Sequence, residues 1–347
     1  MRYVINGRFF VRRVTGVERY ARELLAELDR LAAPGEILLA VPPGAKDVPE
    51  YRNIRVERVG RLKGQLWEQL ELPAFLRRMG AVAVNLCNTS PLIAPGVVCI
   101  HDMKIRAVPH SYSVLFRWWY RVLFANAVRR SKGLMTVSAF SRSEMRRYYG
   151  VPEEKVAVIP NGWQHYQRVP FDETALRRFG LEKQTYCFAL GSMEPSKNLD
   201  WIIRAARRHP QWVFAVAGGV QPGVFAEGAG TELPGNLRLL GYVSDSEAKT
   251  LMRDCWAFLF PSLYEGFGIP PMEALCAGAR RVAVADIPVM HEIYGGSVTY
   301  VDPRGECPDP ASLPEKDGTA VLERFAWRES AEELLAYLRQ IAGEGCP

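Results

Sequence analysis

Short apolar segments alternate with amphipathic helical segments along the chain, and the alternation restarts near residue 183. Strands that alternate with helices indicate βαβ units and a parallel sheet, so we predict an α/β fold. The expected helices are 17–31, 66–78, 112–130, 142–149, 199–208, 244–253, 271–277 and 326–341. The expected strands are 3–6, 37–41, 54–59, 82–85, 97–100, 134–137 and 156–159, then 186–190, 213–217, 237–240, 257–260 and 282–285.

The length of 347 residues predicts two domains, because one hydrophobic core rarely serves more than roughly 250–300 residues. We place an N-terminal Rossmann-like domain at 1–167 and a C-terminal one at 168–325. A C-terminal helix lies within 326–347, and packing back on the N-terminal domain is one arrangement open to it. Ligands of open α/β sheets bind at the carboxyl ends of the strands, so we expect a ligand crevice there.

Composition narrows the classes of protein. The seven cysteines form no C-x-x-C pair, which indicates buried thiols rather than a disulfide framework or a zinc site. The N-terminus is too polar for a signal peptide, and no apolar stretch approaches the roughly 20 residues that span a bilayer. A net charge of +6 suits an anionic ligand or membrane surface, while a spread of basic residues along the whole chain disfavours a nucleic-acid partner. We therefore expect a cytoplasmic protein.

The segment 260–275, Phe-Pro-Ser-Leu-Tyr-Glu-Gly-Phe-Gly-Ile-Pro-Pro-Met-Glu-Ala-Leu, predicts a strand, a turn and a helix. Gly266 and Gly268 permit a tight turn whose N–H groups can face a ligand, and a helix start attracts a diphosphate. Glu265 and Glu273 flank this turn, and carboxylates accept hydrogen bonds from sugar diols. An ordinary strand–helix turn with an acid near the helix start is the alternative.

This segment resembles the E-x7-E motif of the retaining glycosyltransferases of family 4, also called group 1, which have the GT-B fold. That fold consists of two Rossmann-like domains facing each other across a deep cleft. The resemblance implies that Glu265 lies at the donor sugar and that Glu273 binds the ribose hydroxyls. It also implies that the backbone of Gly266, Phe267, Gly268 and Ile269 lies against the diphosphate.

Other pieces of the family pattern follow in order. Residues 15–20 resemble the glycine loop after the first strand, which makes Gly16 a donor-binding residue. His101 and Asp102 resemble the His-Asp pair at a strand end, and the resemblance implies that His101 sits beside the transferred sugar as a catalytic residue. A structural role is the alternative for such a histidine. Segments 137–141 and 159–162 resemble the Val-Ser-x-Phe-Ser and Pro-Asn-Gly motifs.

In the second half, residues 191–198 resemble the segment whose lysine contacts the donor phosphates, which assigns that role to Lys197. Ser192 lies in this donor-binding segment. Residues 240–245 resemble the loop that frames the nucleotide base, with Tyr242, Val243 and Asp245 as its donor-binding residues. Two departures from the pattern stand out. Ser192 and Ser196 stand where the family often carries an arginine, and residues 279–282 replace the commoner small-residue-Pro-Val run. We expect a structural role for Arg281, and a position near the cleft is the alternative.

The resemblance implies a retaining, metal-independent glycosyltransferase that moves a hexosyl unit of the mannose, glucose or rhamnose type. The donor would be a nucleotide-diphosphate sugar, and the acceptor a glycan or lipid-linked glycan of cell-surface polysaccharide biosynthesis. Lys197 and the amides of the glycine turn suit the charge that grows on the leaving diphosphate. The chain has no D-x-D pair, and we expect neither a cofactor nor a metal.

Two alternatives stay open: a non-catalytic nucleotide-sugar or glycan-binding protein of the same fold, and a sugar-nucleotide epimerase that needs no acceptor. The helix 112–130 raises a further question, because Leu115, Trp118 and Trp119 share it with Arg117 and Arg121. It can lie on an anionic membrane, or it can face the core with a solvated basic face. We expect peripheral contact with the inner face of an anionic membrane.

Overall fold

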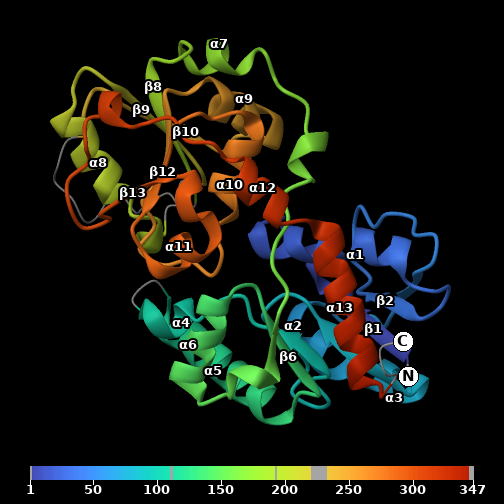
Figure 1. Ribbon diagram of the computed structural model, residues 1–347. Coiled ribbons are helices and arrows are strands. Elements are labelled where there is room, and N and C mark those ends of the chain that lie inside the picture. Colours follow the sequence, from blue (N-terminus) through green and yellow to red (C-terminus); the bar gives the residue numbers. More distant parts are fainter. Residues whose placement is uncertain (1, 110–111, 192–193, 220–232, 344–347) are drawn as a thin grey trace. The chain divides into compact units, whose positions relative to one another are not determined.

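The computed structural model describes residues 2–109, 112–191, 194–219 and 233–343, which belong to two compact units (Figure 1). Unit 1 comprises residues 1–162 and 325–347, and unit 2 comprises residues 163–324. The sequence places the first boundary slightly later, at 167. The segment 163–169 belongs to unit 2 because Lys249, itself buried, donates from Nζ to the carbonyls of Tyr166 and Val169, each at 2.7 Å.

Unit 1 contains a seven-stranded parallel sheet in the order β3-β2-β1-β4-β5-β6-β7. The seven strands predicted for this half are all present. They are β1 (Arg2–Asn6), β2 (Ile37–Val41), β3 (Arg55–Arg58), β4 (Ala81–Asn85), β5 (Val97–Cys99), β6 (Gly133–Thr136) and β7 (Val156–Val158).

Unit 2 contains a six-stranded parallel sheet in the order β10-β9-β8-β11-β12-β13. Its edge strand β13 was not predicted. In both sheets the strand order reverses once, between β1 and β4 in unit 1 and between β8 and β11 in unit 2. The strands are β8 (Tyr186–Leu190), β9 (Val213–Ala217), β10 (Leu237–Gly241), β11 (Ala257–Phe260), β12 (Val282–Ala285) and β13 (Thr299–Val301).

The helix predicted over 66–78 is broken by a π-helical turn, η2 (Trp67–Glu71), between α2 (Gly64–Leu66) and α3 (Leu72–Met79). Pro73 explains the break, because it has no N–H to donate to the carbonyl of Gln69 and its ring crowds that carbonyl. The remaining α-helices of unit 1 are α1 (Gly16–Leu31), α4 (Lys104–Ala107), α5 (Val114–Arg130), α6 (Ala139–Tyr149) and α13 (Trp327–Ile341).

The α-helices of unit 2 include two, α11 and α12, that the sequence analysis missed, because neither exceeds two turns. The helices α8 (Leu199–Arg208), α9 (Asp245–Asp254) and α10 (Ile269–Ala277) lie where the sequence predicts helical segments. The short helices of this unit are α7 (Ala175–Phe179), α11 (Pro288–Tyr294) and α12 (Thr319–Arg324).

The last helix, α13, packs against α1 within unit 1 (Figure 1). The rings of Tyr20 and Trp327 meet edge to face with centroids 5.9 Å apart. Arg339 Nε lies 3.0 Å from Glu36 Oε1, and the hydroxyl of Tyr337 donates to the carbonyl of Leu134 at 3.1 Å. The C-terminal segment thus belongs to the core formed by the first half of the chain.

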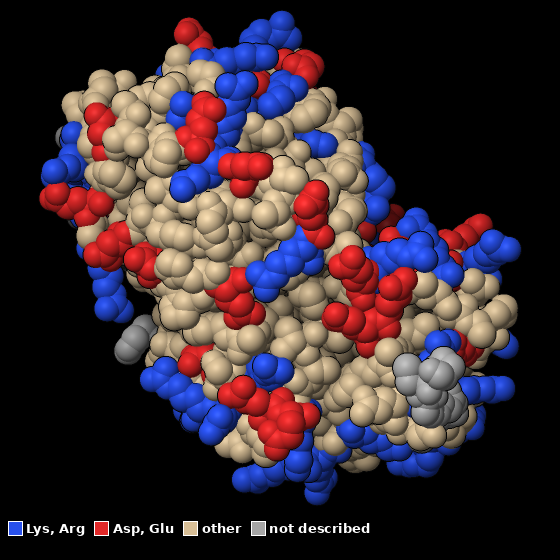
Figure 2. All heavy atoms as spheres, viewed as in Figure 1, with Lys and Arg blue, Asp and Glu red and all other residues tan. Residues whose placement is uncertain are grey.

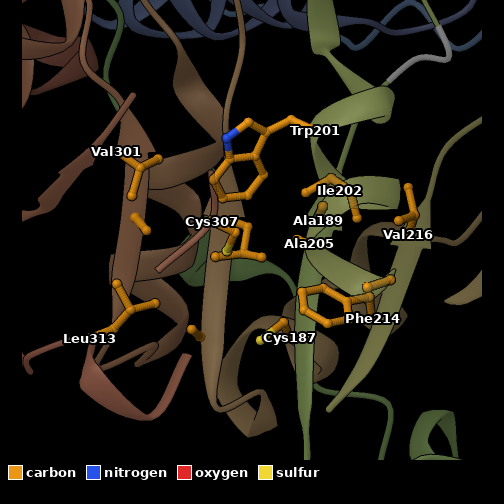
Figure 3. Packing of buried hydrophobic residues seen from close by; sticks show 14 residues of the cluster. Cys187, Ala189, Trp201, Ile202, Ala205, Phe214, Val216, Val301, Cys307 and Leu313 are labelled. Carbon is orange, nitrogen blue, oxygen red and sulfur yellow. The ribbon is translucent and has the colours of Figure 1, made fainter. Parts of the chain in front are cut away.

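Trp201 of α8 lies in the core cluster of unit 2, whose buried side chains also include Phe214, Val301 and Cys307 (Figure 3). Its indole Nε1 donates to the carbonyl of Asp302 at 3.0 Å, so burial leaves no polar atom of the ring unsatisfied. The described cysteines are free thiols, five of them buried. Burial raises the pKa of Cys187, which keeps this thiol protonated and apolar in character.

We expect Trp201→Ala to lower the free energy of unfolding by about 3–5 kcal/mol, because the change opens a large cavity in the core of unit 2. Urea unfolding followed by circular dichroism measures this loss. Trp212→Ala is the control, since Trp212 is only partly buried and packs at the edge of the same cluster. Equal losses in the two variants would contradict a core centred on Trp201.

Candidate functional site

The point where the strand order of unit 2 reverses holds an ion pair between two predicted site residues. Lys197 ends η6 (Pro195–Lys197), which follows β8, and Glu265 follows β11. Lys197 Nζ lies 2.5 Å from Glu265 Oε1, and it lies 5.0 Å from the centroid of the Phe260 ring. The two side chains keep 22% and 14% of their surface exposed. Because both side chains are partly exposed at such a reversal, each can release the other and pair with a bound ligand instead.

A hollow lies beside this pair, at the carboxyl ends of β8, β9 and β11. Gly191, Lys197, Phe260 and Ser262 are among the residues that line it, and part of it is open to solvent. The hollow therefore lies at the edge of the sheet where α/β folds bind ligands.

The glycine turn before α10 has the tight backbone geometry that its sequence predicts. Gly268 precedes the first residue of α10, Ile269, with φ at +84°, and a Cβ there would come within 2.5 Å of Met290 Cε. Tyr294 fixes this turn, because its hydroxyl donates to the carbonyl of Gly268 and accepts from the N–H of Met272. Burial raises the pKa of Tyr294 and keeps that hydroxyl protonated. The side chain of Phe267 is buried, so only its backbone is suited to a ligand.

Glu273, in the first half of α10, is buried and paired with a residue that the sequence analysis missed. His165 Nε2 lies 3.0 Å from Glu273 Oε1, and both side chains are nearly inaccessible. A carboxylate only accepts hydrogen bonds, so Nε2 carries the proton and donates it. No local pattern pointed to His165, because it lies 108 positions before its partner.

The residues expected to frame a nucleotide base differ in what they present. Tyr242 is 66% exposed, whereas the side chain of Val243 is buried. Asp245 is the first residue of α9, whose preceding Ser244 caps the helix by accepting from the N–H of Glu247 at 3.2 Å. Aromatic surface at Tyr242 and backbone groups at Val243 are therefore what this loop offers a ligand.

The positions that depart from the family pattern bring no positive charge to this site. Ser192 lies outside the described residues. Ser196 is fully buried, and its hydroxyl has no hydrogen-bond partner within the described part of the chain. Arg281 is structural, as expected: its guanidinium stacks on Trp256 at 3.9 Å and pairs with Glu315 at 2.8 Å.

His101 and Gly16 belong to unit 1. His101 follows β5, is buried, and has Nε2 2.7 Å from the carbonyl of Leu86. Because a carbonyl only accepts, we assign the proton to Nε2, which leaves Nδ1 as an acceptor. Burial lowers the pKa of His101, so the ring is neutral near pH 7. Gly16 is the exposed first residue of α1 and follows Thr15, whose N–H donates to Glu18 at 3.3 Å.

The strand reversal of unit 1 is filled by the protein's own polar side chains, which the sequence analysis also missed. Asn6 at the end of β1 donates to Asn85 at the end of β4, at 3.0 Å. Arg8 and Glu68 form a buried ion pair at 3.2 Å, and Thr89 bonds to both. Burial lowers the pKa of Arg8, but a guanidinium stays charged in proteins. The polar groups at this reversal thus pair with one another, although Glu68 Oε2 has only its ion pair with Arg8 and no hydrogen bond among the described residues.

Two searches of the described residues gave negative results. No cluster of three or more His, Cys, Asp or Glu side chains with metal-binding geometry occurs among them. Within the same residues, no helix has the length and apolar character needed to cross a membrane.

Both halves of the chain match known families. Residues 14–164 match the family described as "Glycosyltransferase Family 4", and residues 172–302 match "Glycosyl transferases group 1". The chain belongs to this glycosyltransferase family. One match lies in each half of the chain, and together they confirm the resemblance to glycosyltransferase family 4, also called group 1.

Two relatives with curated names are O-antigen chain mannosyltransferases. The chain is 30% identical over 226 residues to RfbU of Salmonella typhimurium, an alignment covering 63% of this chain and 60% of that protein. It is 26% identical over 262 residues to mannosyltransferase B of Escherichia coli, covering 72% and 67%. The match thus spans less than two thirds of the length of RfbU.

Solved structures of low sequence identity share the fold. Sucrose-phosphate synthase from Thermosynechococcus elongatus superposes with a TM-score of 0.73 at 15% identity, covering 99% of this chain and all of that one. HepE from Anabaena, in complex with UDP and glucose, gives 0.70 at 16% identity, with 98% and 100% covered. These neighbours confirm the GT-B fold class.

We expect Gly268→Ala to destabilise the protein by about 2 kcal/mol or more. Alanine disfavours the positive φ at this position, and its Cβ would clash with the side chain of Met290. The measurement is the thermal unfolding midpoint. Gly296→Ala is the control, since a Cβ at that position meets nothing within 4 Å. A midpoint for Gly268→Ala that matches the control would show that the turn is not strained as described.

Proposed function

We propose that the chain is a retaining, metal-independent hexosyltransferase. It moves a hexosyl unit from a nucleotide-diphosphate sugar to a glycan or lipid-linked glycan acceptor of cell-surface polysaccharide biosynthesis. The observation that carries the proposal is the ion pair of Lys197 and Glu265 at the strand reversal of unit 2. The names of the mannosyltransferase relatives favour mannose among the sugars that the sequence leaves open.

The ion pair suggests how a donor is held. Without donor, Lys197 and Glu265 neutralise each other across 2.5 Å. A donor diphosphate offers Lys197 Nζ a more highly charged partner, and Glu265 then turns to the hydroxyls of the sugar. Amides of Gly266, Phe267 and Gly268 add donors near the start of α10, where the helix dipole favours an anion.

Transfer then needs charge stabilisation more than a nucleophile. The bond from the anomeric carbon to the diphosphate breaks, and the bond from the acceptor oxygen to the same carbon forms. The acceptor proton moves to the leaving phosphate oxygen, on the same face, which retains the configuration. Lys197 neutralises the leaving diphosphate as its charge grows. A protein cation and amides supply what a metal supplies in other transferases, so no metal is required.

Glu273 and His101 take supporting parts in this proposal. Glu273 accepts from the ribose diol through Oε2, while His165 holds Oε1 at 3.0 Å and fixes the carboxylate plane. Neutral His101 offers Nδ1 as an acceptor to a hydroxyl of the transferred sugar. Tyr242, Val243 and Asp245 frame the base, and Gly16 of α1 contributes an exposed backbone N–H.

A binding protein without catalysis is the second candidate, and the buried Ser196 favours it. The family often carries an arginine at this position, whereas the serine here brings no charge and no exposed surface. Such a protein would bind a nucleotide sugar without releasing the nucleotide. An epimerase would instead convert the donor sugar with no acceptor present.

We expect slow nucleotide release from one donor among GDP-mannose, UDP-glucose and dTDP-rhamnose, unchanged by EDTA. Lys197→Ala and Glu265→Ala should each lower this rate about 100-fold or more, because they remove transition-state charge stabilisation or the grip on the sugar. Lys183→Ala is the matched control, since Lys183 is exposed and lies 3.7 Å from Asp254. The anomeric configuration of the product, read by NMR, tests retention.

Loss of turnover in EDTA, or variants of Lys197 and Glu265 as active as the control, would contradict the proposal. Tight nucleotide-sugar binding without any release, with acceptor glycans added, would favour the binding protein.

We expect His165→Ala to raise the KM for the donor about tenfold while kcat changes less, because the carboxylate of Glu273 loses its fixed orientation. His165→Gln should restore part of the affinity, since its amide can donate to Oε1. His291→Ala is the control, because His291 pairs with Asp286 at 2.6 Å in an exposed position. Steady-state kinetics against donor concentration measures the difference. An unchanged KM in His165→Ala would overturn the positioning role.

A further inference from the structure

Positive charge is concentrated in one segment of unit 1. Residues 104–149 contain ten Lys and Arg and one Glu, a net charge of +9, whereas the whole chain carries +6, which leaves −3 for the rest. This corrects the expectation that basic residues are spread along the chain. The segment contains α4, α5 and α6, and Figure 2 shows Lys and Arg side chains along the edge of unit 1 that these helices form.

The start of α5 exposes large apolar side chains within this basic segment. Val114 is 72% exposed, Leu115 75% and Trp118 60%. Further along the helix, Leu123 and Phe124 are buried. The second half of α5 is thus anchored in the unit, while its first turns face outward. Of the two readings of this helix, a core-facing one is therefore wrong for Leu115 and Trp118.

The helices α4, α5 and α6 form a continuous surface. Aromatic rings of Phe116 and Tyr120 lie 4.4 Å apart, and Phe124 meets Tyr149 of α6 at 6.4 Å. Arg106 of α4 lies 5.6 Å from the centroid of Tyr149. α5 contains four arginines and no acidic residue, so its apolar start and its positive charge lie on one element.

Within the segment, the arginines of α6 pair with acids, Arg142 and Arg146 with Glu153 and Arg147 with Glu144. We propose that this basic-apolar surface, formed by the exposed start of α5 and the Lys and Arg side chains of α4 and α5, docks on an anionic lipid bilayer. Leu115 and Trp118 enter the headgroup region, where such side chains are favoured. Basic residues near an anionic surface add electrostatic attraction that salt screens. The biological reason for docking rests on the proposed function, since a lipid-linked acceptor is presented at a bilayer.

Charge and apolar exposure together select the bilayer over other anionic partners. A nucleic acid would pair with the arginines, but its phosphate backbone has no use for aliphatic side chains such as Val114 and Leu115. A second copy of the chain would bring the same net positive segment against itself at a symmetric contact. A bilayer with acidic headgroups matches both the charge and the apolar side chains.

The test is sedimentation with vesicles of phosphatidylcholine alone or mixed with phosphatidylglycerol, at low and high salt. We expect binding only to the mixed vesicles, weakened by salt. The double variants Leu115→Ser with Trp118→Ser, and Arg117→Gln with Arg121→Gln, should each bind about tenfold more weakly. Because these side chains are at the surface of α5, the variants should keep the wild-type unfolding midpoint.

Two matched controls distinguish binding through this surface from nonspecific adsorption of the protein to vesicles. Leu66→Ser with Leu70→Ser removes an apolar pair of similar exposure outside the basic segment, and Arg30→Gln with Arg55→Gln removes two exposed arginines that pair with acids. Both should bind vesicles like the wild type. No binding of the wild type to mixed vesicles at low salt would overturn the proposal. So would equal loss in the controls, or preferential binding to single-stranded DNA.

Vesicle binding and nucleotide release from the donor can be measured independently of each other. Variants of α5 should release nucleotide from the donor at the wild-type rate without membranes, because α5 contributes no residue to the Lys197–Glu265 site. Vesicle binding without donor turnover would leave the docking surface intact and remove the proposed function. Donor turnover without vesicle binding would do the reverse.

Discussion

The reversal of strand order between β8 and β11 is the constraint on which the proposed donor site depends. The chain leaves these neighbouring parallel strands in opposite directions, so no connection covers the space at their carboxyl ends. Lys197 and Glu265 meet in that space, although 68 positions separate them. The position of the charged pair is therefore a consequence of topology, and the glycine turn before α10 adds its amides because it follows the same strand, β11.

The two units use the same topological position in different ways. In unit 1 the reversal between β1 and β4 is occupied by Asn6, Asn85 and the buried pair of Arg8 and Glu68. Removing one partner of a buried pair leaves an uncompensated charge, which typically costs 3–5 kcal/mol. At its strand reversal, unit 1 therefore pairs its charged groups with each other in the interior, whereas unit 2 keeps a charged pair that solvent and ligands can reach. This difference is the structural support for assigning the donor to unit 2.

Buried groups also hold the carboxylate of Glu273 in α10, the proposed ribose-binding group, in place. Glu273 is removed from water, and the hydrogen bond from His165 offsets part of that desolvation. His165 in turn lies in a segment that Lys249 fixes through the carbonyls of Tyr166 and Val169. The connection between the halves of the chain thus contributes to the site as well as joining the units.

The sequence by itself determined the strands and most of the helices, because apolar periodicity is local. It also determined the E-x7-E segment, since the Gly268 turn and its flanking carboxylates are contiguous. Only the tertiary structure paired His165 with Glu273 and Arg8 with Glu68, and it alone exposed the start of α5. These features depend on which distant segments pack together. Side-chain spacing along one helix fixes its faces but not which face, or which turn, the rest of the chain covers.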